Sequence, residues 1–215
     1  AIQDRDAKAW PIETGWAQSG ADMGSTNFVL IEKPEVILLA TDELSPNSFG
    51  FAWYYFEQVL DYPMTVVNKS NLVAALNSGQ YNTLVVQDGR VRMDESTSEV
   101  LADWIRKGGK LICSANSVRS VADLPGVQLG DAKKVDSNAK RGEMNYSDRE
   151  RAYIPTMVPG AIYRTELDES HPLAFGLGDH YFSLKTNSVQ FDKMENGWNV
   201  GVINDDLVKM GFAGY

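Results

Sequence analysis

Cysteine and histidine are the scarcest residues of this sequence, with one cysteine and two histidines in 215 residues. A single cysteine cannot form a disulfide within the chain, so an internal disulfide framework is excluded. Two histidines without a cysteine pair argue against a structural zinc site. Apolar runs such as Val36–Ala40 are far shorter than the roughly 18 residues of a membrane-spanning helix, so we expect no membrane span.

Positively charged residues are also fewer than negatively charged ones. Lys and Arg number 20 against 29 Asp and Glu, a formal net charge of -9. This is the wrong sign for a surface that binds the phosphate backbone, so we expect no nucleic-acid partner. Apolar residues make up 43% and charged residues 23% of the chain, which is typical of a globular protein and excludes a disordered one.

The ends of the sequence suggest a part of a longer protein. It begins without Met or an apolar signal core, and it stops in apolar, strand-like sequence. Residues 1–33 are irregular, and we interpret them as an entry segment or linker that packs Trp10 and Trp16 on the domain. Residues 34–215 are expected to form that domain, truncated at its C-terminal end.

Strand and helix patterns alternate from residue 36 to residue 114. Short apolar runs without alternation are typical of strands covered on both faces, and apolar residues at helical spacing lie between them. This order predicts right-handed βαβ crossovers and a doubly wound, mostly parallel α/β sheet of flavodoxin-like type. The predicted strands are 36–40, 64–67, 83–86 and 110–114, and the predicted helices are 45–60, 71–76 and 96–107.

The first predicted helix carries more aromatic residues than one buried face needs. Ser45 is a candidate cap, and the predicted core stripe is Phe49, Trp53, Phe56, Val59 and Leu60. Tyr54 and Tyr55 are left over, and tyrosine suits an interface that is half wet. Gly108 and Gly109 are expected to end the third helix.

The second half is less regular. Residues 131–153 carry a mixed charge run, typical of an exposed insertion or solvated helix, with a contact surface for a neighbouring domain as the alternative. Segments 161–167, 181–184 and 198–203 look like strands, which adds β elements to the α/β domain.

Polar residues follow three of the predicted parallel strands, where ligands bind in open sheets. The candidates are Asp42, Asp88, Ser114 and Asn116, with Glu43 beside the first. One interpretation is a ligand-binding module whose acidic pocket takes a cationic or amine-bearing ligand. A second is a pair of carboxylates for acid–base work. A third is that these acids cap helices or face water.

The segments Asn82–Gly89 and Gly108–Ile112 resemble the core of class I glutamine amidotransferase-like domains. In that family a Gly-Gly supplies an oxyanion-hole amide, and a cysteine stands on a sharp nucleophile elbow. Here the resemblance aligns the elbow with Ala115 and the first oxyanion glycine with Asp88. It therefore implies the fold without the activity. Cys113, expected in the buried strand, keeps open the alternative of a small cysteine-dependent hydrolase or amidotransferase.

A further set of motifs is similar to the C-terminal amidotransferase-like domain of large bacterial zinc carboxypeptidases. It comprises Gly20–Ser25, Leu44–Gly50, Gly160–Tyr163, Asp168–Gly178, Tyr181–Lys185 and Asn196–Gly201. This resemblance implies a non-catalytic accessory domain that packs on the peptidase domain upstream in the same polypeptide. It also implies a periplasmic or extracellular location, and zinc only in the peptidase domain.

The two histidines do not carry the zinc motif of that peptidase family. Its His-x-x-Glu is absent, because Ala174 follows His171 and Ser183 follows His180 at that spacing. We expect no cofactor or metal in this chain. His171, before a proline, is predicted to cap a turn, and His180 is predicted to hydrogen-bond within a loop.

Overall fold

The structure, a computed structural model, divides into two compact units, Ala1–Pro34 and Glu35–Tyr215. Residues are described over 13–28, 32–122, 124–125, 127, 129, 144–149, 151–152, 154, 157–187, 189–204 and 208–213.

The described part of the first unit closes on itself. The amide of Ala17 donates to Asp22 Oδ1 at 2.7 Å, and the amide of Met23 donates to the Gly15 carbonyl at 2.9 Å. The packing of Trp16 on the second unit stays a prediction. Trp10 lies outside the described residues.

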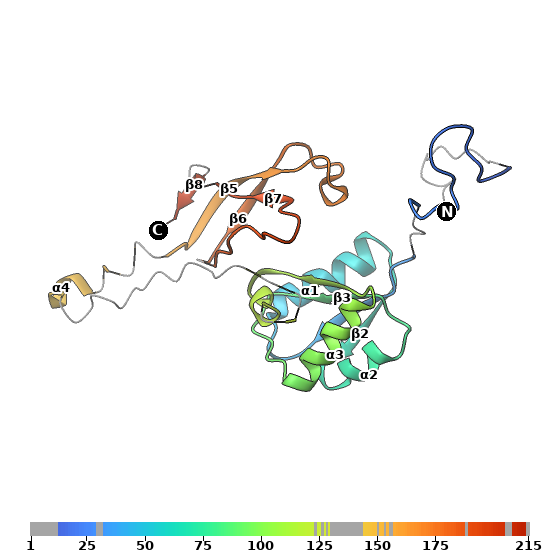
Figure 1. Ribbon diagram of the computed structural model, residues 1–215. Helices are drawn as coiled ribbons and strands as arrows, with labels where there is room; N and C mark the ends of the chain where they lie inside the picture. The colour runs from blue at the N-terminus through green and yellow to red at the C-terminus, as the bar shows by residue number, and fades with distance from the viewer. Residues whose placement is uncertain are drawn as a thin grey trace. The chain divides into compact units, whose positions relative to one another are not determined.

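Four parallel strands form the first sheet of the second unit (Figure 1). They are β1 (Val36–Ala40), β2 (Met64–Asn68), β3 (Thr83–Val86) and β4 (Lys110–Cys113), in the order β2-β1-β3-β4. Pairing is parallel throughout, with Leu38 opposite both Val66 and Val85. This is the strand order of a flavodoxin-like sheet without its fifth strand, so the predicted fold class is confirmed.

Helices lie on both faces of this sheet, as the uninterrupted apolar strands require. They are α1 (Pro46–Tyr54), continued by the π-helical turn η2 (Tyr55–Val59), then the 3₁₀ turn η3 (Lys69–Asn71), α2 (Leu72–Asn77) and α3 (Glu95–Arg106). On one face Ile37 and Leu39 pack with residues of α2 and α3 such as Leu72 and Leu101. On the other face Leu38 packs with Ala52 of α1.

The start of α1 is as predicted, and its core stripe is right at Phe49 and Phe56 but wrong at its other three residues. Ser45 caps the helix by accepting from the Ser48 amide at 3.5 Å. Ala52 takes the position against the sheet, while Trp53, Val59 and Leu60 are exposed. For Val59 and Leu60 the reason is the π-helical turn, in which the Leu60 amide donates to the Tyr55 carbonyl, because an i→i+5 bond rotates the residues at its end off the expected stripe. Trp53 lies before this turn.

The predicted end of α3 is present. Gly108 has a φ of +101°, and the Gly108 and Gly109 amides donate to the carbonyls of Ile105 and Trp104 at 2.9 and 3.0 Å. A β-carbon at Gly109 would lie 2.3 Å from the Trp104 ring. Only glycine therefore fits at this position, between the end of α3 and β4, because the Trp104 ring packs directly against its backbone.

A second, antiparallel sheet supplies the extra β elements predicted for the second half (Figure 1). Its strands are β5 (Gly160–Leu167), β6 (His180–Lys185), β7 (Gly201–Val202) and β8 (Val208–Phe212), with β5 paired to the other three. A 3₁₀ turn, η6 (Pro172–Ala174), lies between β5 and β6.

The strand predicted over 198–203 is wrong except at β7. The Asn199 side chain accepts from the Met194 amide at 2.8 Å and donates to the Met194 carbonyl at 2.9 Å. These two bonds close a loop at a position where the sequence predicts a strand.

The charged segment is described only in part. Residues 131–143, 150 and 153 lie outside the described residues, while Tyr146–Arg149 forms the short helix α4 with exposed side chains. Within the described part of the chain, no helix is long and apolar enough to cross a membrane.

Candidate functional site

The turn after β4 has the backbone geometry of a strained strand-to-helix elbow. Ala115 has a φ of +50°, and the 3₁₀-helix η4 (Ala115–Ser120) begins at this residue. Ser117 is fully buried and anchors the turn, donating its hydroxyl to the Val86 carbonyl at 3.0 Å and accepting from the Ser114 amide at 3.0 Å. A nucleophile elbow presents its side chain from such a turn, and here the exposed side chain is a methyl group.

Asp88, at the end of β3, bonds directly to this turn. Its Oδ1 accepts from the backbone amide of Asn116 at 3.0 Å and from Asn116 Nδ2 at 3.0 Å. In a nucleophile elbow the amide that follows the nucleophile donates to the oxyanion. Here a carboxylate oxygen already accepts from that amide, and its negative charge opposes a developing oxyanion.

The loop after β1 holds Asp88 from the other side. The Ser45 amide donates to the Asp88 carbonyl at 2.7 Å, and Leu44 forms an isolated antiparallel bridge with Gly89. A β-carbon at Gly89 would lie 2.4 Å from the Glu43 carbonyl oxygen, so only glycine permits this approach. The two loops are therefore fixed together, and the Asp88 carboxylate is held toward Asn116.

The neighbouring acids have partners of their own. Glu43 accepts from Lys69 Nζ at 2.9 and 3.0 Å and from the Arg92 amide at 2.8 Å. The lysine hydrogen bond, followed by the amide bond, holds the pKa of Glu43 below its usual value. Asp42 is exposed and accepts from Thr41 Oγ1 at 3.2 Å. These contacts are those of structural acids, not of two carboxylates that share a proton.

Among the predicted ligand-binding residues, the structure bonds Asp88 to Asn116 and places Ser114 next to them. Ser114 Oγ donates to Gln87 Oε1 at 3.2 Å. Sequence reasoning did not find Gln87 or Ser117, because polar residues beside an apolar strand give no signal of their partners.

Cys113 is the last residue of β4 and is half-buried against the core on the α2 and α3 side. Burial raises its pKa to about 11, and a hydrogen bond with Ser117 opposes that rise in part. The side chain is therefore a thiol at neutral pH, whereas nucleophilic attack needs the thiolate.

Both histidines are engaged in local contacts. His171 Nδ1 accepts from the Leu173 amide at 3.2 Å and caps η6, and its ring centroid lies 5.7 Å from that of Trp198. His180 Nδ1 lies 2.5 Å from Asp179 Oδ1, and this hydrogen bond lowers the pKa of Asp179. In the described part of the chain no three His, Cys, Asp or Glu residues are grouped so that they could hold a metal ion.

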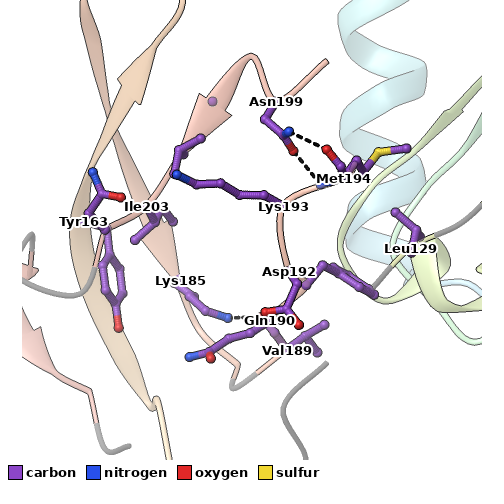
Figure 2. Close-up of a pocket in the computed structure, with 14 residues that line it drawn as sticks. Leu129, Tyr163, Lys185, Val189, Gln190, Asp192, Lys193, Met194, Asn199 and Ile203 are labelled. Carbon is purple, nitrogen blue, oxygen red and sulfur yellow. Dashed lines mark hydrogen bonds between the residues drawn. The ribbon is translucent and has the colours of Figure 1, made fainter. Parts of the chain in front are cut away.

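A cavity of about 560 Å³ lies in the second half, away from the predicted candidates (Figure 2). Its lining includes Tyr163, Lys185 and the loop from Val189 to Met194. Lys185 Nζ donates to the Asn187 carbonyl at 2.7 Å, to Asn187 Oδ1 at 3.3 Å and to the Val189 carbonyl. Because these acceptors use its three protons, the lysine closes the loop and does not offer a cation to a ligand.

No family model matches the chain, and no curated protein matches it either. Among solved structures, the chain is similar to a putative GMP synthase subunit from Thermoplasma acidophilum. The identity is 11%, the TM-score is 0.45, and the match covers 75% of this chain and 68% of the other. It is also similar to a glutamine amidotransferase from Thermotoga maritima. That identity is 9%, the TM-score is 0.48, and the coverage is 80% of this chain and 67% of the other. Since both TM-scores lie below 0.5, the fold class rests on the strand order and register.

Proposed function

We propose that the chain is a non-catalytic, amidotransferase-like accessory domain that packs on the peptidase domain of a secreted zinc carboxypeptidase-like polypeptide. The motifs of residues 20–50 and 160–201 support the choice of that polypeptide. The observation that carries the non-catalytic role is the Asp88 carboxylate bonded to the Asn116 amide beside Ala115.

Acyl transfer through a covalent intermediate needs a nucleophile and free donors for the oxyanion. Ala115 has no nucleophilic atom, and the amide of Asn116 is bonded to a negative charge. Cys113, the alternative nucleophile, is a half-buried thiol whose raised pKa opposes thiolate formation. These features support a domain that keeps the elbow as part of its fold and not as a catalytic site.

The ligand-binding alternative needs polar groups that are free to meet a ligand. At the strand ends Asp88 is bonded to Asn116, and Glu43 forms an ion pair with Lys69. Because both carboxylates already have hydrogen-bond partners within the chain, these contacts favour the accessory role over a site for a cationic ligand.

In this proposal zinc belongs to the peptidase domain, and the location is periplasmic or extracellular. The described residues of this chain do not fit the metal, because His171 caps a turn and His180 pairs with Asp179. The domain's contribution is to stabilise the peptidase domain or shape access to it.

The test compares the full-length polypeptide with a variant that lacks residues 34–215. We expect the variant to unfold at a lower temperature and to lose carboxypeptidase activity faster on incubation. Equal stability and equal activity in the two proteins would refute the accessory role. The companion measurement is hydrolysis of the glutamine side-chain amide by the full-length polypeptide and by the variant that lacks residues 34–215. Hydrolysis by the first protein and not by the second would refute the non-catalytic assignment.

A further inference from the structure

The outer surface of α1 and η2 carries a second apolar stripe that the parallel sheet does not use. Phe51, Tyr54 and Tyr55 stand at i, i+3 and i+4, so their side chains share one face of the helix. Their exposures are 69%, 55% and 41%. The Phe51 and Tyr55 rings are stacked with centroids 6.2 Å apart and an interplanar angle of 13°. We call these three residues the aromatic stripe.

The helix is apolar on more sides than the sheet covers. Ala52 is buried against β1 and β3, and Phe49 and Phe56 pack beside it. A helix that is hydrophobic all round is normally buried all round. We therefore expect the aromatic stripe to be buried against another surface.

The chemistry of the surface indicates an apolar protein partner. Between Pro46 and Leu60 the only charged residue is Glu57, in a chain of net charge -9. A membrane-surface helix carries Lys or Arg on its polar face, and a nucleic-acid surface needs them too. Two tyrosines and a phenylalanine, with charge depleted, are instead the composition of a protein–protein interface core.

The size of the stripe indicates where that partner lies. A fully exposed aromatic side chain presents about 150–250 Å², so at these exposures the three rings offer roughly 300 Å². With a matching area on the partner the interface is about 600 Å² or somewhat more. This is below the roughly 1,200–2,000 Å² of stable complexes between separate proteins, but it falls within the roughly 600–1,500 Å² of interfaces between domains of one chain.

We infer that the aromatic stripe docks on an apolar surface of a neighbouring domain in the same polypeptide. A second copy is the weaker occupant, because it needs more area and brings together two chains of net charge -9. This inference rests on the proposed function in that it needs a neighbouring domain, and it names the surface through which that domain is held.

The experiment is hydroxyl-radical footprinting of the isolated chain and of the full-length polypeptide. We expect the modification rates of Phe51, Tyr54 and Tyr55 to fall at least fivefold in the full-length polypeptide. The combined variant Phe51→Gln, Tyr54→Gln and Tyr55→Gln should lower the unfolding temperature of this domain in the full-length polypeptide to its value in the isolated chain. Phe175→Gln is the matched control, because Phe175 is 91% exposed outside the stripe, and it should leave that temperature unchanged.

Several outcomes overturn the inference. These are unchanged rates in the full-length polypeptide, protection of Phe175 in place of the stripe, or a full-length product with no further domain. Protection that appears in the isolated chain with rising concentration, together with a doubled sedimentation mass, would assign the stripe to a second copy. If removal of residues 34–215 leaves the peptidase unaffected while the stripe is protected, the accessory role fails and the docking surface stands.

Discussion

Replacing Asp88 with alanine should destabilise the chain, because it removes the acceptor that holds the elbow. Its Oδ1 accepts two hydrogen bonds from Asn116, each of 3.0 Å. A hydrogen bond to a charged group contributes about 1.5–3 kcal/mol. Since both residues are half-exposed, water replaces part of each bond when the carboxylate is absent. We therefore expect Asp88→Ala to lower the free energy of unfolding by about 2 kcal/mol, and Asp88→Asn by about 1 kcal/mol, because the amide keeps one acceptor.

The assay is urea unfolding followed by tryptophan fluorescence, in which the buried Trp104 reports on the core. Asp42→Ala is the matched control, because that carboxylate is exposed and accepts a single 3.2 Å bond from its neighbour Thr41. We expect the control to change the free energy of unfolding by less than about 0.5 kcal/mol. Equal effects of Asp88→Ala and Asp42→Ala would refute the assignment of Asp88 as the residue that fixes the turn.

Other substitutions test the packing and the electrostatics of the same domain. Gly109→Ala would place a methyl group 2.3 Å from the Trp104 ring, so we expect the free energy of unfolding in urea to fall by about 1–3 kcal/mol. The control is Gly50→Ala in α1, whose added methyl group meets nothing within 4 Å and should not lower that free energy. Equal urea midpoints for the two variants would contradict this prediction. The pKa of Glu43 is lowered in the folded chain, so its contribution to stability is present above the unfolded pKa and lost as the pH falls through the folded one. Glu43→Gln should therefore flatten the loss of stability between about pH 5 and pH 3, and unfolding curves with the same pH slope as the wild type would count against the ion pair. Cys113, with its pKa raised to about 11, should react with iodoacetamide far more slowly in the folded chain than in urea at pH 7; a faster folded-state rate would instead favour the hydrolase alternative.

The parallel half of the fold could be predicted from the sequence because its two central strands, β1 and β3, are buried on both faces. Val36–Ala40 and Thr83–Val86 read as unbroken apolar runs, and such runs occur where helices cover both sides of a sheet. The capping residue Ser45 and the glycines after α3 marked helix ends by local chemistry. These signals depend only on a few neighbouring residues, so they can be recognised without knowing the tertiary structure.

The errors arose where a tertiary or side-chain contact decided the outcome. The π-helical turn at Tyr55–Val59 changes the helical period, and no spacing rule based on 3.6 residues could place Val59. The loop closed by Asn199 on Met194 replaced a strand, since a side-chain amide competes with the sheet for backbone partners. Sequence patterns count residues along the chain and do not reveal such partners.

The candidate site shows the same limit and also explains why the elbow persists without a nucleophile. The alignment pointed to Ala115 and Asp88, but it did not reveal that the Asp88 carboxylate bonds to Asn116. A non-glycine residue with positive φ costs about 1–2 kcal/mol, and such strain persists only where the surroundings over-determine it. Here Ser117 ties the turn to β3, and Asp88 ties it to the loop after β1. The strained turn therefore needs no catalytic role to account for it, because the contacts that hold it also join two loops at the ends of the parallel strands.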